Sequence, residues 1–228
     1  MTKEQFSLFE SAGPSYEQVA GEPVSGATFL PGINPEEGYP DITRMSELKS
    51  LAEQCNRCPL RGGCSQVVFG DGLEDADIML VGEGPGQSED EIGLPFVGRA
   101  GQLLDRILEA TGISRPQVYI TNVVKCRPPG NRLPNPNEIA ACRGYLEAQI
   151  RLVKPRIMIC LGALATQTLV DGKAKITQVR GKWFVRSGIM IMPTFHPAAL
   201  LRNESLKRPV WEDFKQIRQE IANKGLKA

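Results

Sequence analysis

The chain has 228 residues, a formal net charge of +1 and a hydrophobic fraction of 41%, which is typical of a globular domain with a proper core. No apolar run approaches the roughly 18 residues needed to span a bilayer, and the N-terminus lacks the basic start and apolar core of a signal peptide. We therefore expect a monomer in the cytoplasm with no membrane attachment. Six cysteines in that reducing compartment favour metal ligands or free thiols over disulfides.

The charge is unevenly distributed. Residues 1–43 contain seven acidic residues and one lysine, so the remainder carries a net charge of +7. A basic body suits a polyanionic partner. The first 40 residues are rich in Gly, Pro, Ser and Glu without periodicity, which predicts a disordered acidic tail over 1–40 and a folded domain over 41–228. Asp41 or Thr43 is expected to cap the first helix.

Beyond the tail, strand-like and helix-like segments alternate. The pattern predicts strands near 77–82, 118–124, 156–161 and 189–194. It predicts helices near 100–111, 136–153, 162–170, 197–203 and 206–223. This alternation indicates an α/β fold, a three-layer α/β/α sandwich around a central, mostly parallel four-stranded sheet.

The segment 78–104 carries the strongest functional signal. An apolar run at 78–81 ends in Gly-Glu-Gly-Pro-Gly at 82–86, where glycines let a ligand approach the main chain. Carboxylates, Phe96 and Arg99 follow. The spacing matches neither GxGxxG nor a phosphate-binding loop, which disfavours a nucleotide cofactor. It indicates instead a site at the carboxyl end of a sheet.

Polar residues also follow the other predicted strands. Asn122 ends the second strand, and His196, the only histidine in the chain, follows the fourth. A lone histidine is usually structural. Because the carboxyl ends of parallel strands meet at one edge, this placement favours a catalytic role for His196.

Four cysteines are spaced as two widely separated pairs, Cys55 with Cys58 and Cys126 with Cys142. Four thiolates can hold zinc or an iron–sulfur cluster, and spacing alone leaves both metals, or no metal, open. Cys160 lies in an apolar strand and is interpreted as core. Cys64 falls outside the pattern as a possible stray ligand.

Four motifs occur in a characteristic order, GEGPG at 82–86, LPFVGRAGQLL at 94–104, TNVVKCRPPGNR at 121–132 and HPAALLR at 196–202. With the cysteine spacing, they resemble the family 4 uracil-DNA glycosylases, the iron–sulfur branch of that superfamily, over about residues 50–222. The resemblance implies an enzyme that flips uracil out of single- or double-stranded DNA and hydrolyses its N-glycosidic bond. It also implies a [4Fe–4S] cluster on the four paired cysteines.

A base-flipping enzyme needs a stacking face, a group that reads the base edge and a leaving-group stabiliser. We assign the stacking face to Phe96; the alternative is that Phe96 is an ordinary core residue. We assign the reading of the base edge to Asn122; the alternative is that Asn122 is an ordinary turn residue. The Asn122 amide matches uracil O4 and N3–H and rejects cytosine. His196 is expected to donate to uracil O2, with its protonation state left open. The main-chain N–H groups of the segment from Gly84 to Gly86 are expected to hold the same oxygen, and Pro85 is counted with this segment as part of the uracil-binding site.

Activation of the water is less clear from the sequence. Other branches of the superfamily carry Asp or Asn at the position that corresponds to Gly84. Glu83 is the first candidate to orient the water, and Glu89 is the second. Alternatively, Glu89 fills the space beside uracil C5 and excludes the methyl group of thymine.

DNA contacts are expected at basic residues near these strand ends. The candidates for phosphate binding are Arg99, Lys125, Arg127, Arg132 and Arg202. Leu200 or Leu201 is expected to wedge into the space that the flipped base vacates.

Two rival functions remain open. One is a glycosylase with broader specificity for deaminated bases; a variant that becomes covalently trapped on abasic DNA is disfavoured, because it needs a second histidine. The other is a non-catalytic iron–sulfur protein that binds DNA.

The acidic tail contains one apolar segment, Gln5, Phe6, Ser7, Leu8 and Phe9. It resembles the short peptides with which bacterial replication and repair proteins dock on the sliding clamp. The alternatives are a coincidence or a segment that packs on the body.

Overall fold

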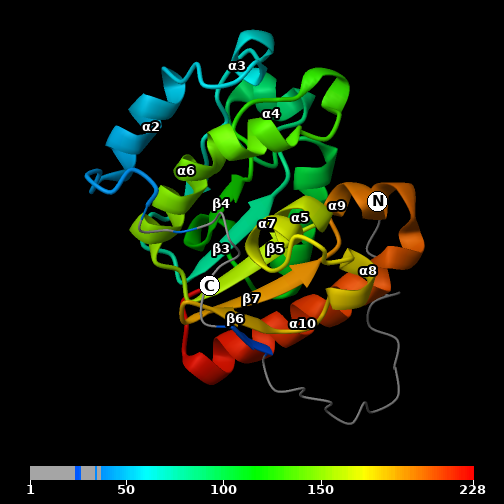
Figure 1. Cartoon of the computed structure of the whole chain (residues 1–228). Helices are drawn as coiled ribbons and strands as arrows, with labels where there is room; N and C mark the ends of the chain where they lie inside the picture. Colours follow the sequence, from blue (N-terminus) through cyan, green and yellow to red (C-terminus); the bar gives the residue numbers. More distant parts are fainter. Residues whose placement is uncertain (1–23, 27–33, 35–36) are drawn as a thin grey trace.

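The computed structural model describes residues 24–26, 34 and 37–228. Its centre is a seven-stranded sheet of order β1-β6-β7-β5-β3-β4-β2 (Figure 1). The strands are β1 (Val24–Gly26), β2 (Asp71–Gly72), β3 (Ile78–Gly82), β4 (Tyr119–Asn122), β5 (Ile157–Leu161), β6 (Phe184–Arg186) and β7 (Ile189–Thr194). The four predicted strands are the central ones, β7, β5, β3 and β4, and they are parallel. The predicted fold class is confirmed.

Helices cover both faces of the sheet (Figure 1). They are α2 (Met45–Glu53), α3 (Leu60–Gly63), α4 (Gln87–Ile92), α5 (Arg99–Ala110), α6 (Pro136–Val153), α7 (Ala163–Leu169), α8 (Ile176–Val179), α9 (Pro197–Arg202) and α10 (Lys207–Lys224). Leu48 of α2 and Leu146 of α6 pack with Met79 on one face. Leu104 of α5 and Phe214 of α10 pack with Leu80 on the other. Alternate residues of β3 therefore serve two separate cores.

The sheet is wider than the predicted four strands. β6 is antiparallel to β7 and is joined to it by Ser187 and Gly188, which have φ angles of 47° and 78°. Two positive φ angles in a two-residue loop are typical of a hairpin turn. The short β2 is antiparallel to β4. Residues Val24–Gly26, inside the tail that was expected to be irregular, form β1 beside β6.

Helix starts were predicted with mixed success. α6 begins at Pro136, where the sequence predicts a helix to begin, and Glu138 Oε2 accepts a hydrogen bond from the Asn135 N–H at 2.6 Å, as in a capping box. The predicted caps of α2 are wrong, because Arg44 occupies the N-cap position and its side chain makes no capping bond. The acidic stretch after the glycine turn was not predicted to be helical, yet it forms α4.

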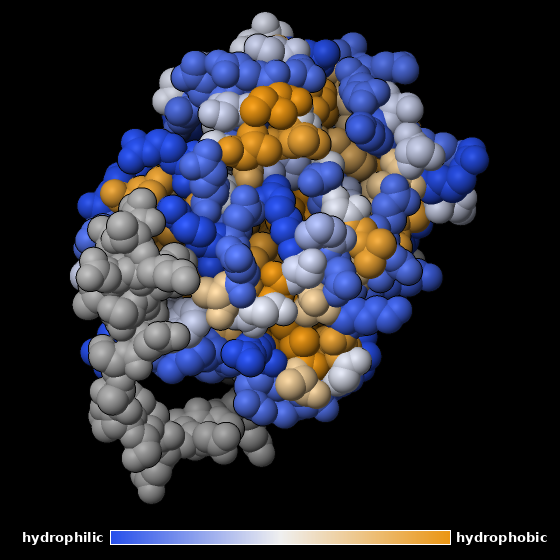
Figure 2. Space-filling view, turned by 180° about the vertical axis from the view of Figure 1, so that it is seen from behind, coloured by the Kyte–Doolittle hydropathy of each residue, from blue (hydrophilic) through white to orange (hydrophobic). Residues whose placement is uncertain are grey.

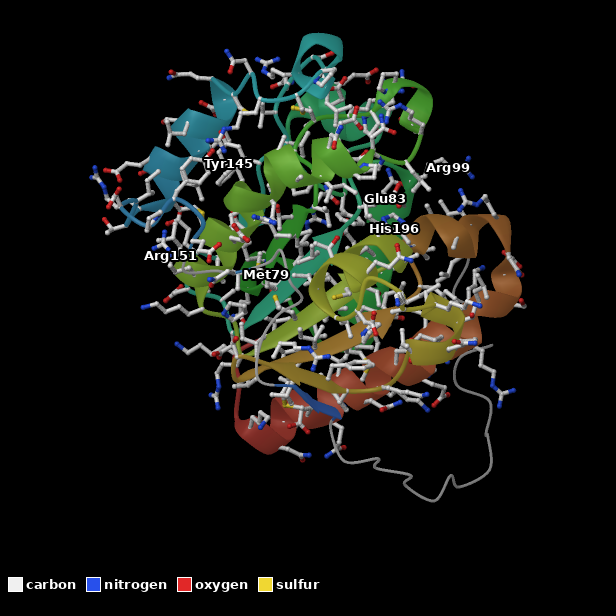
Figure 3. All side chains as sticks on the ribbon, viewed as in Figure 1. Met79, Glu83, Arg99, Tyr145, Arg151 and His196 are labelled. Atoms are coloured by element: carbon white, nitrogen blue, oxygen red, sulfur yellow. The ribbon has the colours of Figure 1, made fainter. Side chains whose placement is uncertain are left out.

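Strand register brings the predicted site together. Gly82 at the end of β3 pairs with Asn122 at the end of β4, and Leu161 at the end of β5 pairs with Thr194 at the end of β7. All four carboxyl ends thus meet at one edge of the sheet. Glu83, Arg99 and His196 lie at that edge (Figure 3).

Hydrophobic residues on the surface are dispersed. Seen from behind, the molecule is mainly hydrophilic with separate apolar patches (Figure 2). Among the described residues, the exposed large hydrophobic side chains are Leu51, Leu73, Ile92, Leu94, Leu133 and Leu201. Within the described part of the chain, no helix has the length and apolar character that crossing a membrane requires.

Candidate active site

Three predicted site residues meet above Gly82. A side chain at Gly82 would overlap Asn122 Oδ1 and come within 2.6 Å of Phe96 Cζ, so only glycine leaves room for the amide and the ring. The ring centroid of Phe96 lies 5.5 Å from that of His196, with the planes tilted by 31°. The structure therefore brings the predicted stacking, edge-reading and leaving-group residues into one cluster.

The amide of Asn122 is buried with an unused acceptor. The residue is 1% exposed, and Oδ1 has no hydrogen-bond partner among the described residues. A buried acceptor left unpaired costs about 1–3 kcal/mol, and most such atoms in native proteins find a partner. The oxygen is therefore suited to accept a hydrogen bond from a ligand.

The imidazole of His196 is held as a neutral donor. Its Nδ1 accepts a hydrogen bond from the Ala198 N–H at 3.1 Å, so the proton of the neutral ring lies on Nε2. Burial is the main cause that lowers the pKa of His196 to about 4; Arg202 contributes to the decrease and Glu89 opposes it. The surroundings of His196 therefore favour the neutral ring, a choice that the sequence left open.

Glu83 directly follows the last residue of β3 and is half-buried. Burial raises the pKa of its carboxyl group above the ordinary value, and Arg202 opposes that change. A raised pKa makes the carboxylate a better proton acceptor.

Glu89 connects two loops through its carboxylate. Oε2 accepts from the Gly86 N–H at 3.1 Å, and Oε1 accepts from the N–H groups of Val97 at 2.9 Å and Gly98 at 2.8 Å. This corrects the expectation for the glycine turn, because the Gly86 N–H is already donated and Pro85 has no N–H to offer. Of the three residues predicted to hold uracil O2, only Gly84 keeps an N–H for that purpose.

Lys125 was predicted to bind DNA, and this prediction is wrong. The side chain is 2% exposed. Its Nζ donates to Thr121 Oγ1 at 2.7 Å, to the main-chain oxygen of Asn122 at 2.7 Å and to Gln149 Oε1 at 2.6 Å. The chain turns inward after β4, so the ammonium group satisfies the carbonyl at the strand end and cannot reach solvent.

Two further DNA predictions need correction. Leu200 is 1% exposed in the core, whereas Leu201 is 39% exposed, so only Leu201 can act as a wedge. Arg132 forms a two-pronged ion pair with Glu138, at 2.9 and 2.7 Å, and its charge is thereby balanced.

The other predicted phosphate contacts remain accessible. Arg99 and Arg202 are exposed. Arg127 is half-buried, and its Nε donates to Asn131 Oδ1 at 2.8 Å.

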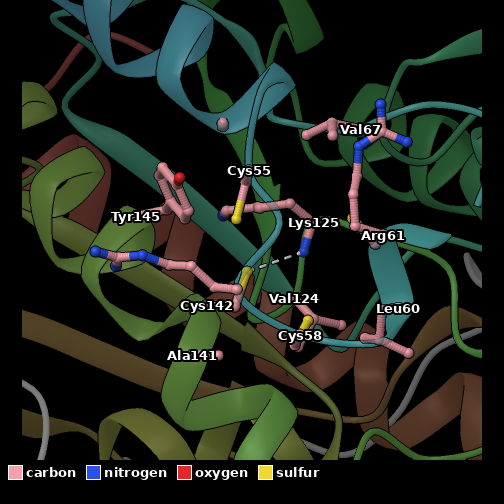
Figure 4. Close-up of a pocket in the computed structure, with 13 residues that line it drawn as sticks. Cys55, Cys58, Leu60, Arg61, Val67, Val124, Lys125, Ala141, Cys142 and Tyr145 are labelled. Atoms are coloured by element: carbon pink, nitrogen blue, oxygen red, sulfur yellow. Dashed lines mark hydrogen bonds between the residues drawn. The ribbon is translucent and has the colours of Figure 1, made fainter.

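The four paired cysteines line a single pocket (Figure 4). Cys55 and Cys58 come from the loop between α2 and α3, Cys126 follows β4, and Cys142 lies on α6. The Lys125 N–H donates to Cys142 Sγ at 3.3 Å. Segments far apart in the sequence are thus joined at this pocket.

The donor set of this pocket is four cysteine sulfurs. Thiolates are ligands of both zinc and iron–sulfur clusters, so the chemistry of the donors fits either group. Within the described residues, no group of three or more Cys, His, Asp or Glu side chains is placed so as to hold a single metal ion.

The two remaining cysteines differ in environment. The pKa of the Cys126 thiol is raised, mainly by burial and next by its interaction with Cys64, which lies beside it. Cys160 is fully buried in the core, as the sequence suggests.

One network beneath the site was missed. Asp213 on α10 is fully buried; it accepts from Thr194 Oγ1 at 2.6 Å and pairs with Arg180. It thereby anchors the end of β7, two residues before His196. A sequence signal existed, because Asp213 lies on the apolar face that Val210, Phe214 and Ile217 define on the same helix.

Comparisons with known proteins agree with this geometry. A family model described as the uracil DNA glycosylase superfamily matches residues 69–215. The type-4 uracil-DNA glycosylase of Thermotoga maritima is 48% identical, covering 79% of this chain and 96% of the relative. That of Sulfurisphaera tokodaii is 44% identical over 77% and 85%, and that of Archaeoglobus fulgidus is 41% identical over 79% and 92%. The chain therefore belongs to the type-4 family of the uracil-DNA glycosylase superfamily.

Proposed function

We propose that this protein excises uracil from DNA. It flips the uracil nucleotide out of the stack, hydrolyses the N-glycosidic bond and leaves an abasic site, the first step of base excision repair. The observation that carries the proposal is the buried Oδ1 of Asn122, which has no hydrogen-bond partner in the described part of the chain and lies in one cluster with the ring of Phe96 and the imidazole of His196. Membership of the type-4 family supports it.

Asn122 reads the base. Its Oδ1 accepts the N3–H of uracil, and its Nδ2 donates to O4. Cytosine presents the opposite donor and acceptor pattern at this edge, so it would leave buried polar groups unpaired. The ring of Phe96 supplies the stacking face.

His196 stabilises the leaving group. When the bond between C1′ and N1 breaks, its electron pair stays on the base and negative charge develops at O2. The Nε2–H of His196 donates to that oxygen, and the Gly84 N–H assists. One such donor is typically worth about 10²–10³ in rate.

Glu83 orients the attacking water. The water oxygen bonds to C1′ and its proton passes to the Glu83 carboxylate, whose raised pKa suits this transfer. Glu89 keeps the glycine turn and the start of α5 together and does not touch the water.

DNA binds through the basic edge around the site. Arg99, Arg127 and Arg202 contact phosphates, and Leu201 enters the gap left by the flipped base. Because phosphate contacts release counterions, binding weakens steeply as salt increases.

Cys55, Cys58, Cys126 and Cys142 hold a [4Fe–4S] cluster. When bound, the cluster supplies a cross-link between the loop after α2, the segment after β4 and α6. The position of the four thiols around one pocket supports this assignment. Burial raises the pKa of Cys142 to about 11, so its thiolate would form only with a bound metal to stabilise it.

The tail docks on a sliding clamp through Gln5, Phe6, Ser7, Leu8 and Phe9, which lie outside the described residues. Leu8 and Phe9 would enter an apolar pocket, with an affinity near micromolar because the segment must be ordered on binding. The test is titration of a peptide of residues 1–15 against the clamp of the source organism. Binding that is lost in the Leu8→Ala/Phe9→Ala peptide supports the contact; equal binding of both peptides contradicts it.

The protein acts as a monomer in the cytoplasm, where bacterial and archaeal DNA is found. The separate surface patches support the monomer, because obligate interfaces are larger and continuous.

The activity test uses the purified holoprotein and end-labelled oligonucleotides, single- and double-stranded. Each strand carries one uracil, hypoxanthine, cytosine or thymine, and alkali reveals abasic sites. Cleavage at uracil alone supports the proposal. Cleavage at hypoxanthine as well indicates a broader glycosylase, and binding without cleavage indicates a non-catalytic protein.

A further inference from the structure

The turn that carries Phe96 is strained. Phe96 has a φ of 54°, in the left-handed region that a non-glycine residue seldom occupies because it is strained there. Its ring is 5% exposed, against the Asn122 amide and the His196 imidazole. Such a conformation persists only where the surroundings hold it.

Arg115 supplies that support from outside the site. It opens a short helix, η1 (Arg115–Gln117), between α5 and β4. Its Nη2 donates to the Pro95 oxygen at 2.7 Å, and its Nη1 donates to the Phe96 oxygen at 3.1 Å and to Asp105 Oδ1 at 2.6 Å. One guanidinium thus binds both carbonyl groups of the strained turn.

The rest of the turn is held as closely. Glu89 accepts the next two N–H groups, those of Val97 and Gly98. A side chain at Gly101 would overlap the Phe96 carbonyl group, so α5 packs directly on the turn. The turn is fixed by Glu89 on one side and by Arg115 on the other.

We propose that Arg115 is a positioning residue that holds Phe96 in its left-handed conformation and so aligns the ring for the flipped base. The inference rests on the proposed uracil excision. Without the guanidinium, two carbonyl groups lose their donors and Phe96 can relax to a negative φ. That relaxation would turn the ring away from Asn122 and His196, although Arg115 itself never touches DNA.

A double-mutant cycle tests this dependence. We expect Arg115→Ala to lower the single-turnover rate of uracil excision about tenfold, since small misplacements of a positioning group are costly. Affinity for uracil-free DNA should stay unchanged. If Arg115 acts only through Phe96, the Phe96→Ala/Arg115→Ala protein is no slower than Phe96→Ala. Millimolar guanidinium should restore Arg115→Ala but not Phe96→Ala.

The controls separate positioning from folding. Arg44→Ala is the matched control. Arg44 is exposed and pairs with the carboxylate of Glu47, as Arg115 pairs with that of Asp105, and its removal should leave the rate of uracil excision unchanged. Arg115→Lys keeps the charge and one donor, so it should fall between wild type and alanine, and it replaces Arg115→Ala in the cycle if the alanine protein fails to fold.

Two results would overturn the proposal: a wild-type rate in a folded Arg115→Ala protein, or additive losses in the double variant. Failure of the proposed function is distinguishable, because the wild-type protein itself would then leave uracil in place.

Discussion

The Nζ atom of Lys125 lies 2.7 Å from the main-chain oxygen of Asn122, and the N–H of the same lysine lies 3.3 Å from Cys142 Sγ. A single buried residue therefore contacts both the strand end that carries the amide proposed to read uracil and a cysteine of the proposed cluster. The side chain also binds Gln149 on α6. Lys125 Nζ has three oxygen acceptors, so the amino group is satisfied in the core although none of these acceptors is a carboxylate.

Replacing Lys125 should destabilise the fold. Lys125→Met keeps the length of the side chain but leaves the Asn122 and Gln149 oxygens without their ammonium donor. We expect the free energy of unfolding to fall by about 3 kcal/mol, the range for buried groups left unpaired. Urea denaturation under anaerobic conditions measures this, with the exposed Lys215→Met as a control. A midpoint equal to wild type would refute the structural role.

The cysteine pocket should bind iron. Protein purified without oxygen should absorb broadly near about 400 nm and contain about four irons per chain. Cys55→Ala and Cys142→Ala should lose iron and stability. Cys160→Ala, which removes a buried thiol away from the pocket, should keep its iron. Stoichiometric zinc in the wild-type protein would contradict the assignment.

Asn122→Asp should change base preference. A carboxyl group loses the donor to uracil O4 and gains an acceptor for the exocyclic amine of cytosine. We expect slower excision of uracil and a higher ratio of cytosine to uracil cleavage. The ratio is read from parallel single-turnover reactions on strands that differ in one base. If it does not move, Asn122 does not read this edge.

His196 should remain neutral across the physiological range. Because it is the only histidine in the chain, its two ring nitrogens give one unambiguous set of ¹⁵N resonances. These should report the Nε2–H form from pH 8 downward, with a midpoint at about 4. A midpoint near the ordinary value of about 6.5 would show that the ring is charged more readily than the structure implies.

The same shift links stability to pH. Below about pH 6.5 the unfolded chain takes up a proton at His196, whereas the folded protein resists it until about pH 4. The free energy of unfolding should therefore fall as the pH decreases through this window. Denaturation midpoints at pH 7 and pH 5 measure this effect. The loss of stability between the two pH values should be smaller in His196→Gln than in the wild-type protein, because the variant has no imidazole to protonate.

The sequence predicted which residues meet at one edge of the sheet, and the reason is topological. Gly82, Asn122 and His196 were recognised because each ends or follows an apolar run, and parallel strands align such ends. The order of the motifs then supplied the roles that we propose for these residues. Neither inference required knowledge of side-chain packing.

Packing decided the parts that were missed. Lys125 points inward because the chain turns after β4, and Leu200 is buried because it lies on the side of α9 that faces the core. The type of a residue does not reveal either orientation. Arg115 acts on a turn about twenty residues away, and Asp213 acts through α10. Such contacts depend on how the helices dock on the sheet, so sequence patterns alone could not supply them.

The central claim is that Asn122 and His196 together bring about uracil excision. Its most direct measurement is the single-turnover rate of uracil release by wild type, Asn122→Ala and His196→Ala under the same conditions, with cluster content matched by absorbance. The account predicts that each alanine protein is slower by about 10²-fold or more, a loss of about 3 kcal/mol of transition-state stabilisation. Rates close to wild type in both variants would contradict it, even if the protein still released uracil.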